Sequence, residues 1–231
     1  MKGLFLTFEG TECSGKSTQV AILAERLRAA GQKVRTVREP GGTAIGEEIR
    51  HILKHSEANR NMTAETELLL MNASRAQLVG EIIAPALAEG EIVLCDRFYD
   101  STLAYQAYGR GLDRQTVRQI ISFAVGAIRP DVTILLTIPV AVSEQRRQAR
   151  QPAAAGPGAQ LGAPIRDRME EEARDFFERV EEGYRQIAAA EPRRIRVVEG
   201  GALVSEVGAR VWSVVEPLVG AWRAGGAERI G

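Results

Sequence analysis

The chain has 231 residues, which fits one α/β domain or at most two small ones. Hydrophobic residues make up 45% of it, enough for a sizeable core. Its 30 basic and 30 acidic side chains give a formal net charge of zero, so the charge balance predicts neither a nucleic acid nor an acidic membrane as a partner.

Two cysteines, Cys13 and Cys95, form neither a disulfide framework nor a CxxC pair. The chain has no long apolar run with a cleavage site and no uncharged apolar span of about 18 residues. We therefore expect a reduced, soluble, cytoplasmic protein.

Apolar runs and helix-spaced apolar residues alternate along the chain, with Gly and Pro between them. The expected strands are 4–8, 33–38, 91–95, 131–138 and 195–198. The expected helices are 16–30, 44–54, 64–88, 99–108, 113–127, 140–149, 168–189 and 202–222. Strands separated by helices predict a parallel five-stranded sheet with helices on both faces, in a single domain over 1–231.

One segment breaks this alternation. Residues 151–164 read QPAAAGPGAQLGAP, a composition that buries little apolar surface and predicts mobility. It is either a surface loop or part of a short active-site lid over 147–168, and the arginines on both sides favour the lid.

The strongest local motif follows the first expected strand and opens the first expected helix. It matches the P-loop pattern G-x-x-x-x-G-K-[ST], in which backbone N–H groups and a helix N-terminus surround a phosphate. Lys16 is expected to bridge the β- and γ-phosphates and to serve catalysis, and Ser17 to bind Mg²⁺. The expected ATP-binding residues are Gly10, Thr11, Glu12, Cys13, Ser14, Gly15, Lys16, Ser17 and Thr18.

A carboxylate at the end of another expected strand helps to distinguish among the classes of P-loop protein. Asp96 ends the apolar run 92–95, the usual place of an acid that holds Mg²⁺ directly or through water, so Ser17 and Asp96 are the candidate metal residues. The chain lacks the NKxD motif of a GTPase. Arg97 directly after this acid suggests a second phosphate, as in a kinase whose acceptor is itself phosphorylated.

Five blocks along nearly the whole chain resemble the thymidylate kinase family. They are the P-loop block from Phe8 to Gln19, the REPGGT block from Arg38 to Thr43, Leu69 to Gln77, the DR…AYQ…GRGL block from Asp96 to Leu112, and a later block from Asp167 to Tyr184. The resemblance implies a P-loop nucleoside monophosphate kinase fold. It also implies ATP-dependent phosphorylation of dTMP with Mg²⁺, and a homodimer that uses 64–88 and 113–127.

The resemblance also implies roles for individual residues. Arg38 and Arg97 would clamp the acceptor's 5′-phosphate, which suits the two parallel donors of a guanidinium. Arg75 would donate to the base O4, and Tyr105 would exclude a 2′-hydroxyl. The implied dTMP-binding residues are Glu12, Arg38, Glu39, Met71, Arg75, Arg97, Ser101, Thr102, Tyr105 and Gln106.

One subtype of the family carries an arginine directly after the P-loop acid, where this chain has Cys13. The chain resembles the other subtype, whose arginines lie on the lid. The candidates are Arg147, Arg150, Arg166 and Arg168, and we expect Arg150 first as the residue that completes the catalytic set Lys16, Arg38, Arg97 and Asp96.

Three positions depart from the family pattern. Met71 stands where the family has a Phe that stacks on thymine, Ala107 replaces a Gly, and Thr137 replaces an Asp. Met71 keeps a broader pyrimidine monophosphate kinase open as an alternative. Two further alternatives are a non-catalytic nucleotide-binding protein and a P-loop ATPase or GTPase that drives a partner.

Overall fold

The computed structural model describes residues 3–149 and 172–225. The predicted lid from residue 150 onward, with Arg150, Arg166 and Arg168, therefore lies outside the described residues.

Five parallel strands form one sheet in the order β2-β3-β1-β4-β5, which confirms the predicted sheet. Buried β1 lies at its centre, and its Phe8 is in register with the last residue of β3. The strands are β1 (Leu4–Glu9), β2 (Val34–Arg38), β3 (Ile92–Asp96), β4 (Val132–Thr137) and β5 (Ile195–Glu199).

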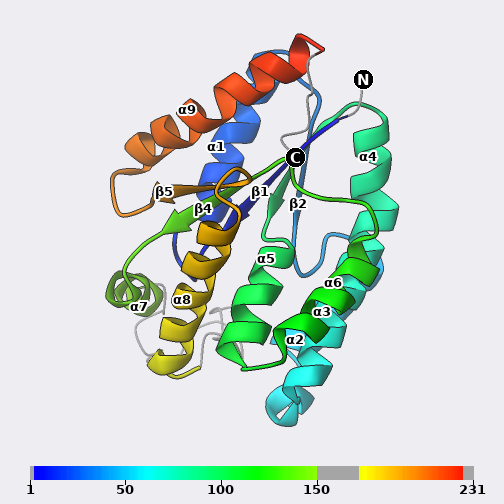
Figure 1. Cartoon of the computed structure of the whole chain (residues 1–231), viewed down its shortest axis with the longest axis vertical. Coiled ribbons are helices and arrows are strands. Elements are labelled where there is room, and N and C mark those ends of the chain that lie inside the picture. The colour runs from blue at the N-terminus through cyan, green and yellow to red at the C-terminus, as the bar shows by residue number, and fades with distance from the viewer. Residues whose placement is uncertain (1–2, 150–171, 226–231) are drawn as a thin grey trace, which may run out of the picture.

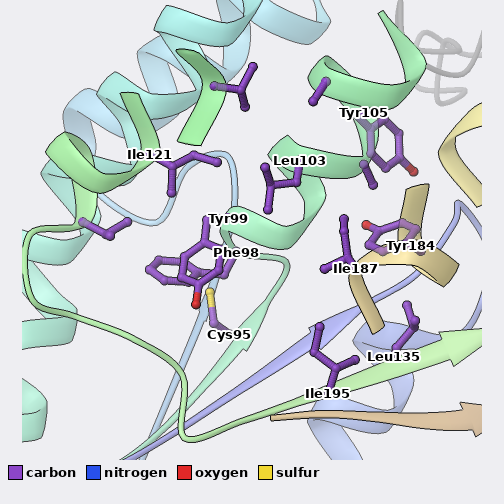
Figure 2. Packing of buried hydrophobic residues seen from close by; sticks show 14 of the residues in the cluster. Cys95, Phe98, Tyr99, Leu103, Tyr105, Ile121, Leu135, Tyr184, Ile187 and Ile195 are labelled. Atoms are coloured by element: carbon purple, nitrogen blue, oxygen red, sulfur yellow. The ribbon is translucent and has the colours of Figure 1, made fainter. Parts of the chain in front are cut away.

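Side chains of alternate strand residues enter two separate cores, as the pleat of a strand requires. Leu4, Leu6 and Phe8 pack with α1 (Lys16–Ala29) and α9 (Val204–Arg223) on one face. Phe5 points to the other face, which is covered by α3 (Ala64–Leu78), α5 (Tyr99–Thr102), α6 (Arg114–Val125) and α8 (Arg174–Ala190). Figure 1 shows the helices around the sheet, and Figure 2 shows part of the second core, with Tyr99, Ile121 and Ile187 among its residues.

Three further α-helices are described. α2 (Ala44–Lys54) packs along α3, α4 (Ala84–Ala88) precedes β3, and α7 (Val140–Ala149) follows β4. Ala86 and Leu87 of α4 and Val140 of α7 belong to the core on the Phe5 face. No helix within 3–149 and 172–225 is long and apolar enough to cross a membrane.

Three helix predictions need correction. The helix expected at 168–189 begins only at Arg174, because Ala173 has extended backbone with φ −67° and ψ 158°. The segment 64–88 is interrupted by a π-helical turn at Val79–Ile83, just before Pro85, which has no N–H to donate. The segment expected at 99–108 becomes π-helical over Leu103–Gly109. A short 3₁₀ helix at Glu57–Asn61 was not predicted.

Candidate active site

The P-loop joins β1 to α1 at the carboxyl edge of the sheet. Gly10 has φ 138°, and a Cβ there would lie 2.2 Å from the Leu136 carbonyl oxygen, so only glycine fits without a shift. Gly15 precedes α1 with φ 97°, and no side chain caps the first turn. The first N–H groups of the helix are thus open to an anion.

Lys16 is folded over this loop and is 6% exposed. Its Nζ donates to the carbonyl oxygens of Gly10 and Thr11 at 3.1 and 2.8 Å, and to Ser14 Oγ at 3.3 Å. Burial, together with the positive charge of Arg97, lowers the pKa of Lys16 to about 8, although nearby carboxylates oppose this. The cation lies where a triphosphate would enter the loop.

The two candidate metal residues are in contact. Ser17 Oγ donates to Asp96 Oδ2 at 2.5 Å, joining the start of α1 to the end of β3. A hydroxyl and a carboxylate are oxygen ligands of the kind that Mg²⁺ prefers. The donor set therefore fits Mg²⁺. The described residues contain no group of three or more His, Cys, Asp or Glu side chains that could hold a metal ion.

Arg97 lies between the P-loop and the neighbouring helices, with a left-handed φ of 72°. Its Nη2 donates to Glu12 Oε1 at 2.8 Å, and its Nη1 donates to the Gly10 carbonyl and to Tyr184 Oη at 3.0 and 3.2 Å. Burial opposes the charged form of Glu12, but Arg97, Lys16 and Lys54 together lower the pKa of Glu12 to about 2. The structure thus holds a mostly buried ion pair beside the phosphate loop.

Glu9 is a site residue that the sequence analysis did not single out. It is fully buried at the end of β1 and accepts hydrogen bonds from the Phe98 N–H at 2.7 Å, Ser101 Oγ at 2.5 Å and Tyr184 Oη at 2.9 Å. These contacts hold the turn that carries Arg97. Its position in the sequence could have identified it, because Glu9 follows an expected parallel strand and ligands bind at the carboxyl ends of such strands.

Most of the implied acceptor-binding residues line one pocket, with about 500 Å³ of empty space including its open mouth. Nine of the predicted residues line it, namely Glu12, Glu39, Met71, Arg75, Arg97, Ser101, Thr102, Tyr105 and Gln106. Pro40, Lys54 and Phe98 also line it and were not predicted. Figure 2 shows two of the lining residues, Phe98 and Tyr105, among the buried side chains of the core.

Arg38 is the predicted acceptor residue that does not line this pocket. Its Nη2 donates to both carboxylate oxygens of Glu47 on α2, at 2.9 and 3.0 Å, and its Nη1 donates to the Pro40 carbonyl. Both side chains of this ion pair are more than 40% exposed.

Arg75 and Glu39 form a second buried pair, at the floor of the pocket. Arg75 Nε and Nη2 lie 2.8 and 2.7 Å from Glu39 Oε2, while Glu39 Oε1 has no hydrogen-bond partner among the described residues. Burial raises the pKa of Glu39 to about 7, against the lowering effect of Arg75. Asn72 Oδ1 and the Phe98 carbonyl accept further bonds from Arg75 and fix its guanidinium.

A family model described as thymidylate kinase matches residues 8–211. The chain belongs to the thymidylate kinase family. It is 45% identical over 214 residues to a thymidylate kinase of a Synechococcus strain, covering 93% of this chain and 95% of that protein. It is 49% identical over 198 residues to a thymidylate kinase of Geobacter sulfurreducens, covering 86% and 89%.

A solved structure of a thymidylate kinase from Ehrlichia chaffeensis has the same fold. The two chains are 31% identical with a TM-score of 0.71, over 94% of this chain and 99% of that one. The P-loop monophosphate kinase fold is therefore established for this member of the thymidylate kinase family.

Helix α7 reaches the P-loop in this thymidylate kinase family member. Ser143 Oγ donates to the Glu12 carbonyl at 2.7 Å, and Arg146 Nη1 donates to the Cys13 carbonyl at 3.3 Å. Arg146 was not one of the four arginines predicted for the triphosphate. Arg146 thus brings a guanidinium from α7 to the loop, whereas the side chain of Arg147 lies outside the described part of the structure.

The two histidines and the two cysteines lie in different parts of the molecule. His51 and His55 lie on exposed positions of α2 and at its end, with ring centroids 6.2 Å apart. Cys13 lies in the P-loop with φ 57°, and Cys95 is buried, with its Sγ against the Arg97 carbonyl.

Proposed function

We propose that the chain transfers the γ-phosphoryl group of ATP to the 5′-phosphate of dTMP, giving ADP and dTDP. The observation that carries this proposal is that the P-loop and the acceptor pocket have one residue in common. Glu12 belongs to the P-loop and also lines the pocket that contains the implied dTMP residues, so a donor and an acceptor would meet there.

The donor half of the site is the P-loop. Its N–H groups and Lys16 would hold the triphosphate, with Lys16 leaving the loop carbonyls to which it now donates. Ser17 and Asp96 would hold Mg²⁺, which neutralises charge on the β- and γ-phosphates when bound.

The acceptor half needs cations for the 5′-phosphate. Arg97 already lies at the pocket wall, in an orientation fixed by Glu12, Tyr184 and the Gly10 carbonyl. Arg38 would also bind the phosphate, after leaving its ion pair with Glu47. That exchange costs little, because an exposed ion pair contributes only about 0–1 kcal/mol.

The base half of the pocket combines an apolar wall with a few polar groups. Met71 and Phe98 offer contact to a pyrimidine ring, while Arg75, Thr102 and Gln106 offer hydrogen bonds. Tyr105 places its hydroxyl 3.3 Å from Glu12 Oε1, where a sugar would lie and a 2′-hydroxyl would be crowded. A broader pyrimidine acceptor range remains the second candidate, because Met71 has no aromatic face.

Charge on the moving phosphoryl group needs a further arginine, since Cys13 supplies none. We assign this role to Arg150 of the predicted lid 147–168, a residue that lies outside the described part of the chain. Arg146, at the Cys13 carbonyl, would contact the donor nucleotide.

The surface of α2, α3 and α6 supports a homodimer. Four large apolar side chains lie exposed on these helices, namely Ile45, Ile52, Leu69 and Phe123. A second copy would cover them across a two-fold axis. The location proposed is cytoplasmic, in keeping with Cys13 and Cys95, which form no disulfide within the described residues.

The direct test is ADP production with dTMP, dUMP, UMP and CMP as acceptors in the presence of Mg²⁺. ADP formed only with dTMP, or far faster with it, supports the proposal. Equal use of CMP would favour the broader kinase, ADP without any acceptor would favour an ATPase, and no ADP would favour a non-catalytic protein.

A further inference from the structure

Glu67 is a buried carboxylate that lies directly behind the pocket and is not one of its lining residues. It is on α3 and 0% exposed, yet its two oxygens are well supplied with donors. Gln106 Nε2 donates to its Oε1 at 2.8 Å, and Arg110 donates from Nε and Nη2 at 3.2 and 3.0 Å. None of the five family blocks includes Glu67.

Arg110 pairs with this carboxylate. Its guanidinium forms a two-pronged contact with Glu67, pairs with Glu172, and lies 4.8 Å from the centroid of the Phe176 ring. An ionised carboxylate can only accept hydrogen bonds. The end of the Gln106 amide that faces Glu67 must therefore be the NH₂ group, because the reverse orientation would bring two acceptor oxygens together.

A fixed amide leaves its other end for the ligand. Gln106 lines the pocket, and no donor within 3–149 and 172–225 reaches its Oε1. Arg75 lines the same pocket and carries only donors. The base site thus offers one donor and one acceptor in a set order.

That order matches one class of pyrimidine. Thymine and uracil present the O4 acceptor next to the N3–H donor, whereas cytosine presents the N4 donor next to the N3 acceptor. A cytosine in the same pose would place its N4 donor against the donors of Arg75, and its N3 acceptor against the Gln106 oxygen. Buried unpaired polar groups of this kind are costly.

We propose that Glu67 is a positioning residue that selects 4-keto pyrimidine nucleotides over 4-amino ones by holding the Gln106 amide in one orientation. The inference rests on the proposed function and deepens it, since it concerns the base class that the same pocket accepts. Glu67 acts through Gln106 and does not touch the substrate.

The test uses dUMP and dCMP, which differ only at the edge that the site reads. The wild-type protein should prefer dUMP by about 100-fold or more in kcat/KM. In Glu67→Gln the new amide can donate or accept, so Gln106 is free to turn, and the preference should fall by about 10-fold or more. The matched control is Glu65→Gln, the same change at an exposed position of α3, which should leave the preference unchanged.

The ratio of kcat/KM for dUMP to kcat/KM for dCMP distinguishes this role of Glu67 from a merely structural one. A structural defect would lower kcat/KM for both acceptors together, so an unchanged ratio in active Glu67→Gln would overturn the proposal. Should that variant fail to fold, Glu67→Asp keeps the charge for Arg110 but withdraws the carboxylate from Gln106, and the same fall is expected.

A ligand variant tests the amide orientation in the unaltered protein. N3-methyl-dTMP removes the donor that the Gln106 oxygen would accept, so its kcat/KM should be about 100-fold below that of dTMP. Equal use of both would overturn the proposal. A wild-type protein that makes no ADP with dTMP would instead refute the proposed function itself.

Discussion

Arg97 donates to Glu12 across 2.8 Å, and this contact joins the end of β3 to the phosphate loop. The two residues are 85 positions apart in the chain and both line the pocket. The ion pair is mostly buried, with side-chain exposures of 14% and 20%. A guanidinium held in this way is already oriented before an acceptor phosphate arrives, which is the kind of arrangement that lowers a reaction barrier.

The first prediction concerns Arg97. Arg97→Lys should lower kcat/KM for dTMP by about 100-fold or more, because an ammonium cannot make two parallel bonds to a phosphate while contacting Glu12. Affinity for an ATP analogue, measured by calorimetry, should change little. An equal loss for both nucleotides would place Arg97 in the donor site instead.

The second prediction concerns the charge of Lys16. Its lowered pKa of about 8 means that the ammonium form is lost as pH rises through that value, so kcat/KM for ATP should fall above about pH 8. The pH profile of kcat/KM reports this group in the free enzyme. Lys16→Ala should lose several orders of magnitude in turnover, and its residual activity should show no such decline.

A third prediction concerns the backbone of the P-loop. Gly10→Ala should lower the free energy of unfolding by about 1–3 kcal/mol, since its Cβ would meet the Leu136 carbonyl, and it should weaken ATP binding. Gly80→Ala is the matched control. A Cβ at exposed Gly80 meets nothing within 4 Å, so urea denaturation should show no loss of stability there. Equal effects of the two changes would contradict the packing argument.

The fourth prediction separates two arginines. Arg150→Ala should reduce kcat strongly with a modest change in dTMP affinity, because its assigned role is on the transferring group. Arg146→Ala should chiefly raise KM for ATP, since Arg146 contacts the P-loop at Cys13. Steady-state kinetics with each nucleotide varied in turn would test both. A normal kcat in Arg150→Ala would remove it from the catalytic set.

The fifth prediction concerns assembly. Phe123 is 91% exposed on α6, and Phe123→Glu should convert the proposed dimer into a monomer, because a carboxylate cannot be buried unpaired at an interface. Leu203→Glu, at a 69% exposed position before α9, should remain dimeric. Light scattering at the same concentration would measure both, and a monomeric wild-type protein would refute the dimer.

Local sequence patterns were enough to predict all five strands within one residue of their observed bounds. Runs such as 92–95 are apolar throughout because both faces of a parallel sheet are covered. Helix ends were less well predicted. Helix α8 begins at Arg174, and Glu172 just before it pairs with Arg110, a contact between distant segments that no periodicity records.

By itself, the sequence determined the alternation of strands and helices, the P-loop and the family motifs, because each depends on residues close together in the chain. The tertiary structure alone decided which carboxylates support the site. Glu9 meets Tyr184 and Glu67 meets Gln106 only because strand order and helix packing bring segments 175 and 39 residues apart into contact. Their burial makes each hydrogen bond specific, since a misdirected polar group there would lose its partner without gaining water.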